Sequence, residues 1–390
     1  MSAAIVLTLT GTGLAAARDL HGEASVVVGV DADPWRPGRH SRLVTQIRGL
    51  SASPLDANLL APMQQWAAAQ PSPPVVVPCC DAACEWVIDH KPEIEAFARV
   101  SPSYVEAEAG MLLDKLRFGQ RCAELGIDVP LTVVPRDRAD VTAFIAAAGL
   151  PCIVKPREGH LWRHRLRGQK LLIPQTEAEL LALLDDVIGD PTAVVLQELI
   201  PGAESELVVG AVLTDVTGAP RHVLTARKLR QFPRDFGSGS LVQTQHLPEV
   251  RALSEQVVGL LGYRGVCGTE FKRDPRNGRL RLIEINPRPT LWFDLCRAAG
   301  THLIRAHFQE LATGRISPIR AQRDGVTWRY WARDLIALAQ AHGGHPLQLL
   351  RELSSSPRAD TLATMALRDP RTIAATLAHT AFQAVSHLRR

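Results

Sequence analysis

The sequence predicts an α/β protein in three parts: a Rossmann-like N-terminal domain, an α+β core and a helical C-terminal tail. Three observations support this fold class. Short apolar runs near the N-terminus alternate with helical patterns. A polar β-hairpin pattern lies in the second half of the chain. The patterns after residue 300 are helical, and beyond residue 346 they are rich in arginine. We expect domains at residues 1–104, 105–315 and 316–390.

Length, charge and cysteine content limit the function. A chain of 390 residues is long enough for two or three domains with buried cores. Its net charge of +4 is too small to argue for a nucleic-acid or membrane-surface partner. No run of eighteen apolar residues predicts a membrane span, and the first residues lack the basic region of a signal peptide. Because seven cysteines in such a chain are typical of free thiols, we expect a cytoplasmic protein.

The N-terminal segment predicts a βαβ unit. An apolar strand at Ala4–Leu9 is followed by a tight turn at 11–13, Gly-Thr-Gly, and a helix at Leu14–Leu20. A second strand, Val26–Val30, ends at Asp31. This G-x-G-x-x-A pattern with an acidic residue about twenty positions on is typical of dinucleotide-binding domains. One interpretation is therefore an NAD-dependent oxidoreductase, and the other is a Rossmann-like unit whose glycines only make the turn.

The segment that follows extends the same domain. We expect a helix at Leu55–Ala69, a third buried strand at Val75–Val77 and a further helix from Cys84. Ligands gather at the carboxyl ends of parallel strands. Asp81, which follows the third strand, is therefore a candidate to contact a substrate.

The polar hairpin pattern spans Gly265–Pro289. Two runs of alternating apolar and polar residues flank the turn 274–278, Asp-Pro-Arg-Asn-Gly. Folding about this turn places Glu270 roughly opposite Glu284, and Asn286 shares their face, because side chains repeat every second residue in a strand. Two facing carboxylates repel each other, whereas with an amide oxygen they form the hard donor set that Mg²⁺ prefers. The alternative is the solvated polar face of an ordinary hairpin.

The segment Glu270–Arg288, EFKRDPRNGRLRLIEINPR, resembles the metal-binding signature of ATP-grasp enzymes, and within them that of the carboxylate–amine ligases. The resemblance extends over about residues 105–300. It implies an ATP-grasp nucleotide-binding core behind a Rossmann-like domain that binds no dinucleotide. It also implies ATP with Mg²⁺ (or Mn²⁺) as cofactors, the metal being held by the two glutamates and the asparagine of the hairpin. Arg288 would lie near the transferred phosphate.

The same resemblance suggests the ATP-binding residues. Lys115, in a predicted helix at Glu106–Leu125, and Lys155, at the end of a predicted strand, correspond to phosphate-binding lysines. The segment 197–204 is similar to the adenine and ribose contacts of the family. Its last residue, Glu204, would bind the ribose hydroxyls, and Glu206 is the alternative for this role. The candidate contacts are Gln197, Glu198, Leu199, Ile200 and Glu204.

Residues 157–170 depart from the family pattern. Many ATP-grasp proteins have a glycine- and serine-rich loop there, whose backbone N–H groups close over phosphates. This chain has a basic segment with only two glycines. Either its arginines cover the phosphates by side-chain charge, or the segment serves another purpose.

A second basic segment, Arg227–Ser240, is predicted as a loop with glycine and serine hinges. We expect Arg227 and Lys228 to face the γ-phosphate or the acyl phosphate, which makes them catalytic candidates together with Arg288. The Gly-Ser run would line the substrate pocket. A nucleic-acid interface is disfavoured because this is one short run in a nearly neutral chain.

The function implied by the resemblance is ATP-dependent ligation of a small-molecule carboxylate to an amine. The product would be an amide formed through an acyl phosphate, with release of ADP and phosphate. Three alternatives remain open: the NAD-dependent oxidoreductase, an ATP-grasp relative that only binds ATP, and an ATP-grasp phosphotransferase. The sequence identifies neither substrate, and it leaves a homodimer open.

Overall fold

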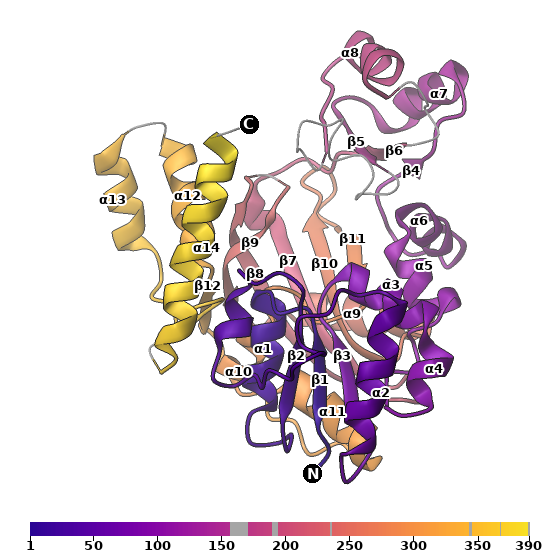
Figure 1. Cartoon of the computed structure of the whole chain (residues 1–390). Coiled ribbons are helices and arrows are strands. Elements are labelled where there is room, and N and C mark those ends of the chain that lie inside the picture. Colours follow the sequence, from indigo (N-terminus) through magenta and orange to yellow (C-terminus); the bar gives the residue numbers. More distant parts are fainter. Residues whose placement is uncertain (157–170, 189–193, 235, 343–344, 367, 389–390) are drawn as a thin grey trace. The chain divides into compact units, whose positions relative to one another are not determined.

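A computed structural model describes residues 1–156, 171–188, 194–234, 236–342, 345–366 and 368–388 (Figure 1). These residues form two compact units. Unit 1 consists of Met1–Gly110, Ala203–Glu270 and Ile285–Arg390, and unit 2 consists of Met111–Gly202 and Phe271–Glu284. The three-part division of the chain at residues 104 and 315 stays a prediction.

A parallel three-stranded sheet forms the N-terminal layer of unit 1. Its strand order is β2-β1-β3, with β1 at Ala4–Leu7, β2 at Val27–Val30 and β3 at Val75–Pro78. All residues of β1 and β2 are buried, as in sheets covered on both faces. The Rossmann-like start is confirmed, but the predicted turn at 11–13 is wrong, because these residues already belong to helix α1 (Gly11–Leu20).

Local chemistry explains why α1 begins so early. The hydroxyl of Thr10 caps the helix by accepting a hydrogen bond from the N–H of Thr12 at 3.3 Å. A Cβ atom at Gly13 would lie 2.1 Å from the carbonyl oxygen of Thr8. Glycine is therefore needed for the close approach of helix and strand, whether or not a ligand binds.

The remaining helices of the first 110 residues follow the predicted order. The predicted helix at 55–69 begins later, at α2 (Leu60–Ala68), after a 3₁₀ turn at Ala57–Leu59. Helix α3 (Asp81–Asp89) begins three residues before the predicted start at Cys84, and α4 (Lys91–Glu95) follows it. Asp81 therefore occupies the first turn of a helix rather than a loop.

A seven-stranded sheet has the order β11-β10-β7-β8-β9-β12-β13. Its strands are β7 (Leu207–Thr214), β8 (Pro220–Phe232), β9 (Ser238–Thr244), β10 (Gly265–Arg273), β11 (Leu280–Asn286), β12 (Thr327–Arg329) and β13 (Thr361–Leu362). The two strands predicted from the polar hairpin pattern are confirmed as neighbours, β10 and β11. The boundary between the two units passes through both of them.

Strands β8 and β9 correct one expectation. The sequence predicts a loop over Arg227–Ser240, but β8 continues through it to Phe232 and β9 begins inside it at Ser238. Lys228 and Arg230 lie on β8 and pair with β9 around a bulge. Strand structure tolerates these basic side chains because carboxylates of neighbouring elements neutralise them. The loop prediction is therefore wrong, although the basic character of the segment is real.

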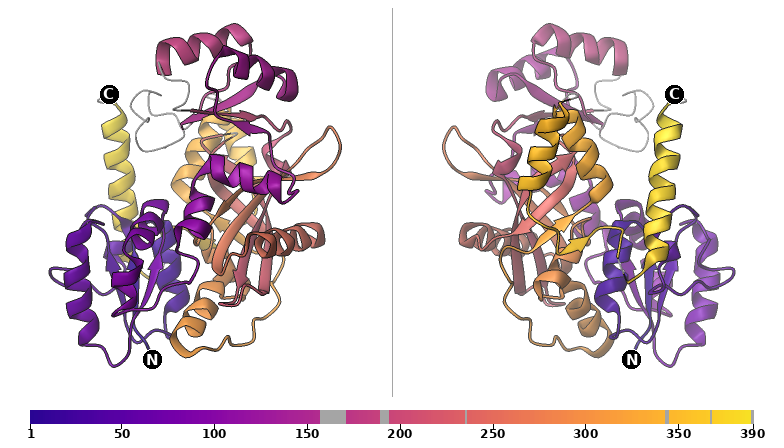
Figure 2. Two further views of the ribbon diagram at one scale, coloured as in Figure 1. Left: turned by 90° about the vertical axis from the view of Figure 1, so that its right-hand side faces the viewer. Right: turned by 90° about the vertical axis from the view of Figure 1, so that its left-hand side faces the viewer.

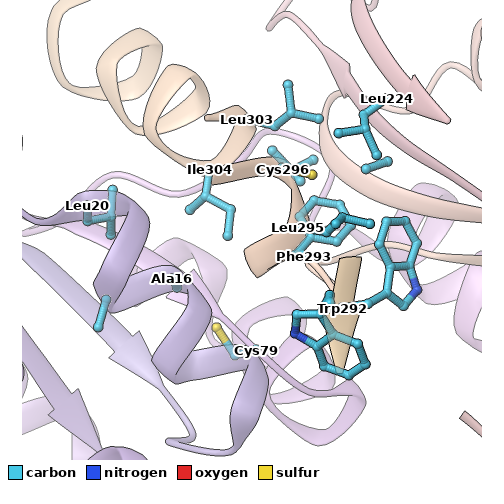
Figure 3. Packing of buried hydrophobic residues seen from close by; sticks show 14 of the residues in the cluster. Ala16, Leu20, Cys79, Leu224, Trp292, Phe293, Leu295, Cys296, Leu303 and Ile304 are labelled. Carbon is cyan, nitrogen blue, oxygen red and sulfur yellow. The ribbon is translucent and has the colours of Figure 1, made fainter. Parts of the chain in front are cut away.

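Helices complete unit 1. They are α9 (Pro248–Leu261), α10 (Asp294–Ala299), α11 (Leu303–Thr313), α12 (Trp331–His342), α13 (Pro346–Ser355) and α14 (Pro370–Leu388). Figure 3 shows Ala16 and Leu20 of α1 near Ile304 of α11, with Phe293 and Trp292 in the same buried cluster. No helix in the described part of the chain is both long and apolar enough to cross a bilayer.

The C-terminal segment is tied to the N-terminal layer. Figure 2 shows α14 alongside it, and the carboxylate of Asp369 accepts hydrogen bonds from the hydroxyl of Ser41 at 2.6 Å and from a neighbouring backbone N–H. The guanidinium of Arg18 donates to Leu362 O at 2.7 Å and to Asp294 at 3.0 Å. The helical character of this tail is confirmed, with β13 as an additional short strand.

Unit 2 contains an antiparallel sheet in the order β4-β6-β5. Its strands are β4 (Thr132–Val133), β5 (Cys152–Pro156) and β6 (Val194–Glu198), and its helices are α5 (Met111–Leu113), α6 (Lys115–Glu124), α7 (Arg138–Ala148) and α8 (Glu177–Ala182). The continuous helix predicted at Glu106–Leu125 is wrong. A π turn and α5 precede a break at Asp114, whose carboxylate caps α6 by accepting from two backbone N–H groups.

Stability should fall in acid because of a half-buried histidine on β8. Burial, with Arg251 nearby, lowers the pKa of His222 from 6.5 to about 4, and its Nε2 atom is buried without a partner among the described residues. Between these two values the unfolded chain binds a proton that the folded chain does not, so the free energy of unfolding decreases as the pH falls. We expect His222→Gln to lose less stability on acidification than the wild type.

Chemical denaturation at about pH 7 and about pH 4.5 measures this difference, because the two values bracket most of the titration window. His246→Gln is the matched control, since His246 is exposed. An acid-induced loss that is the same in all three proteins would contradict the prediction.

Candidate active site

A buried ion pair lies on the seven-stranded sheet within unit 1. Lys228 of β8 places its Nζ atom 2.5 Å from the Oε2 atom of Glu270 on β10. The two side chains are 5% and 14% exposed. A buried carboxylate requires a cationic partner, and Lys228 supplies it. The structure thus brings together a predicted catalytic residue and a predicted metal ligand.

Arg288 lies at the start of the segment that follows β11. Its Nε and Nη2 atoms both lie 2.7 Å from the Oδ1 atom of Asp81, and Nη2 donates to Asn286 Oδ1 at 3.3 Å. Burial lowers the pKa of Arg288, but the charge and hydrogen bond of Asp81, together with the nearby Cys84 and Cys80, hold the pKa above its ordinary value. The guanidinium is therefore charged and oriented by its neighbours, as phosphate recognition requires.

Arg227 has a different environment from Lys228. Neighbouring residues of a strand point to opposite faces, and Arg227 contacts the carbonyl oxygen of Ser205 and, at 3.2 Å, the side chain of Gln245. Glu204, the predicted ribose contact, lies in a 3₁₀ turn and accepts a backbone hydrogen bond from β8 at 3.3 Å. The roles predicted for both residues stay predictions.

In unit 2 a chain of side-chain hydrogen bonds crosses the sheet. The Nζ atom of Lys155 on β5 donates to the Oε1 atom of Gln197 on β6 at 2.8 Å. The amide of Gln197 in turn donates to the hydroxyl of Thr132 on β4 at 3.0 Å. The structure thus brings together two predicted nucleotide contacts, and Gln197 fixes the position of the lysine.

Glu198 has a structural role that the sequence does not suggest. Its carboxylate accepts hydrogen bonds from Arg276 at 2.6 Å, from Arg281 at 2.9 Å and from the N–H of Leu131 at 3.2 Å. Burial raises the pKa of Glu198, but these donors outweigh it and hold the pKa below its ordinary value. Its own N–H donates to Leu131 O at 2.8 Å. The side chain and the backbone donor are therefore engaged within unit 2.

The next residues of the predicted adenine segment differ from Glu198. Among the described residues, neither the backbone N–H nor the backbone carbonyl of Leu199 has a hydrogen-bond partner. The carbonyl of Ile200 accepts a hydrogen bond from Lys272 Nζ at 2.9 Å. Leu199 thus offers a partly buried apolar side chain and free backbone groups, the combination that an adenine ring needs. Lys272 holds the end of this segment in place.

Lys115 is exposed at the first position of α6. Asp114, its neighbour, caps the helix, so the lysine leaves the helix at the end that carries partial positive charge. An anion is favoured at such an end. The geometry is compatible with the phosphate contact predicted for Lys115, which stays a prediction.

The predicted metal ligands divide between the two units. Glu270 and Asn286 belong to unit 1, and Glu284 belongs to unit 2. They lie on the neighbouring strands β10 and β11. In the described part of the chain, no group of three or more His, Cys, Asp or Glu side chains is arranged to hold a metal ion. The predicted metal-binding set consists of two carboxylates and one amide, so it is not a group of that kind. The facing arrangement of Glu270 and Glu284 stays a prediction.

The basic segment at 157–170 lies outside the described residues. The two interpretations of this segment therefore stay predictions.

The N-terminal glycine pattern does not form a dinucleotide site of the expected kind. In such sites the acidic residue after the second strand binds the ribose hydroxyls. Here the carboxylate of Asp31 accepts hydrogen bonds from the N–H groups of Leu9 at 2.7 Å and Asp33 at 3.0 Å, and Arg36 lies 3.6 Å away. This carboxylate is already bound by the backbone N–H groups of neighbouring loops, which disfavours the NAD interpretation.

Known proteins of similar structure decide the fold. A carboxyaminoimidazole synthetase of Staphylococcus aureus superposes with a TM-score of 0.63 over 88% of this chain and 86% of its own, at 15% identity. The biotin carboxylase domain of a 2-oxoglutarate carboxylase from Hydrogenobacter thermophilus gives a TM-score of 0.61 over 84% of this chain and 74% of its own, at 15% identity. The chain has the ATP-grasp fold. The fold class inferred from the sequence is confirmed.

Two curated relatives share sequence similarity with part of this chain. A D-aspartate ligase of Enterococcus faecium is 22% identical over 223 residues, which are 55% of this chain and 53% of the ligase. A D-alanine–D-alanine ligase of Pseudomonas entomophila is 27% identical over 189 residues, 46% of this chain and 56% of the ligase. The chain thus spans about half the length of the curated relatives that it matches. No family model matches it.

Proposed function

We propose that this protein is an ATP-dependent carboxylate–amine ligase. The observation that carries the proposal is an ATP-grasp fold in which Glu270, Glu284 and Asn286 lie on the neighbouring strands β10 and β11. The similarity to two amino-acid ligases agrees with it. The substrates are a small-molecule carboxylate and an amine.

The candidate residues have side chains of the chemical types that bind ATP and magnesium. Glu270, Glu284 and Asn286 would hold Mg²⁺, since they offer the hard oxygen donors that this ion prefers. Leu199 offers the free backbone groups and apolar contact that suit adenine. Lys155, held by Gln197, would bind phosphate. When bound, the metal neutralises charge on the phosphates.

The reaction begins when a carboxylate oxygen of the substrate attacks the γ-phosphorus of ATP. The new O–P bond replaces the bond to the β-phosphate oxygen, and ADP leaves. The amine then attacks the acyl carbon, the C–N bond forms, and inorganic phosphate leaves while the amine proton passes to solvent. Arg288 and Lys228 stabilise negative charge on the transferring group, and Asp81 keeps Arg288 oriented.

No protein nucleophile is needed for this chemistry. Burial raises the pKa of the Cys79 and Cys84 thiols well above the ordinary range, so both thiols remain protonated near neutral pH. These two cysteines are thus poor nucleophiles, which agrees with direct transfer between substrates.

Phosphate and ADP release, measured with ATP across a grid of carboxylates and amines, tests the proposal. Glu284→Gln should abolish most of this release by removing one of two metal carboxylates, with a loss of about 100-fold or more. Glu255→Gln is the matched control, because Glu255 lies on α9 and is 41% exposed. Equal activity of Glu284→Gln and the control would remove the proposed metal site.

The same assay separates the alternatives. ATP binding without ADP release for any substrate pair would indicate a protein that only binds ATP. ADP release without an amide product, checked by mass spectrometry, would indicate a phosphotransferase. We further propose a cytoplasmic location, where ATP is available, and a homodimer, which a mass measurement in solution tests.

A further inference from the structure

A cavity of about 370 Å³ lies in unit 1 beside α11, on elements that contribute no residue to the candidate active site. Its wall includes one face of α11, the segment before that helix, residues 317–320 and Glu23, which follows α1. This volume is at the lower end of the range found for small-molecule sites. The cavity is therefore large enough for a small metabolite.

A buried carboxylate organises this wall. Asp19 is 3% exposed, and its Oδ1 atom lies 2.6 Å from the Nδ1 atom of His302. Its Oδ2 atom accepts a hydrogen bond from the backbone N–H of Arg305 at 3.1 Å. Its backbone carbonyl oxygen accepts a second hydrogen bond from the Nε atom of Arg305 at 2.9 Å. One residue of α1 thus fixes the orientation of both a histidine and an arginine that line the cavity.

The backbone at His302 is held in an unusual conformation. Its φ and ψ angles are 50° and 52°, in the left-handed region that residues other than glycine seldom adopt. Such a conformation is strained and persists where the surroundings enforce it. The hydrogen bond to Asp19 supplies this enforcement and leaves Nε2 of the ring for another partner.

Two arginines of the wall suit an anionic group. Arg305 and Arg320 line the cavity with Glu23, while the carboxylate of Asp19 behind the wall is engaged by His302 and by the backbone N–H of Arg305. Arg320 is exposed and has no hydrogen-bond or ion-pair partner among the described residues. Ser317 and Gln309 add neutral hydrogen-bonding groups. Guanidinium groups are the side chains best suited to bind carboxylates and phosphates in a bidentate manner.

We propose that this cavity is a binding site for a small organic anion that carries a phosphate or carboxylate group. Arg305 and Arg320 bind the anionic group, His302 donates or accepts a further hydrogen bond, and residues 317–320 form one wall of the site. The site is independent of the proposed ligase reaction, because none of its residues belongs to that machinery.

Calorimetric titration of the full chain tests the site with ribose 5-phosphate, citrate and inorganic phosphate, and with ribose as the neutral probe. We expect the charged probes to bind and ribose not to bind. Arg320→Gln should weaken binding by about ten- to 150-fold, the loss typical of a hydrogen bond to a charged group. Gln309→Trp should weaken it by filling the cavity while leaving its charges in place.

Arg315→Gln is the matched control, an exposed arginine of the same segment that does not line the cavity. An anion bound at the ATP site instead would be insensitive to Arg320→Gln and Gln309→Trp, and this result would overturn the proposal. Absence of binding to the wild type, or equal binding of ribose, would overturn it as well. Circular dichroism of each variant verifies that it is folded, so that a loss of binding reports on the site.

Discussion

Replacing Arg288 by lysine is expected to slow substrate-dependent ADP release by about 100-fold or more, the loss typical when a donor to developing charge is removed. Lysine keeps the positive charge but loses the planar fork, in which Nε and Nη2 both contact Asp81 at 2.7 Å. We expect the effect mainly in kcat, because in the proposed mechanism Arg288 contacts the transferring phosphoryl group. Steady-state kinetics with the best substrate pair measure it.

Two further variants sharpen this prediction. Arg315→Lys makes the same substitution at an exposed arginine and should leave kcat unchanged. Asp81→Asn keeps Arg288 but removes the charge that orients it, and should give an intermediate loss of about tenfold. If Arg288→Lys is as active as Arg315→Lys, Arg288 has no part in phosphoryl transfer.

The fold was predictable where local pattern and tertiary structure agree. The buried strands β1, β2 and β3 are short apolar runs, and the Asn-Gly turn between β10 and β11 needs a residue with positive φ, which Gly278 supplies at 73°. The predictions of local structure failed where tertiary contacts determine the conformation. Charge at 227–240 suggested a loop, whereas the segment forms β8 and β9 because carboxylates neutralise its basic residues.

The candidate site was predictable in its residue types and less so in its contacts. Lys228 and Glu270 are 42 residues apart in sequence, and spacing gives no signal for their pairing. The sequence shows Lys272 only as part of the polar hairpin. In the structure its Nζ atom donates a hydrogen bond to the carbonyl oxygen of Ile200. The role of Asp81 as the partner of Arg288 was likewise hidden, because only the fold brings them together.

Glu198 shows a side-chain role that the sequence does not reveal. The nucleotide contact implied by the resemblance at this position stays a prediction, and the carboxylate is the centre of an ion-pair network with Arg276 and Arg281. Arg281 also donates to Asp128 at 2.9 Å, and Asp274, which is 1% exposed, binds Arg276. The arginines around the turn therefore bind the hairpin strand to the rest of unit 2.

Replacing Arg281 by methionine is expected to destabilise unit 2 by about 3 kcal/mol. The side chain of Arg281 is 14% exposed, and its loss leaves Glu198, 10% exposed, with one cationic partner fewer. Removing one member of a buried pair is costly because the remaining charge keeps its desolvation penalty. Hydrogen exchange of the β4 and β6 amides measures the effect within unit 2.

Arg279→Met provides the comparison, since Arg279 lies two residues before Arg281 and contacts Asp128 at 3.3 Å but is 69% exposed. An exposed ion pair contributes at most about 1 kcal/mol, so this variant should exchange nearly as slowly as the wild type. Equal exchange rates in the two variants would mean that Arg281 is no more important than a surface charge. Faster exchange in Arg281→Met alone would show that burial makes this network the link between the hairpin and the β4-β6-β5 sheet.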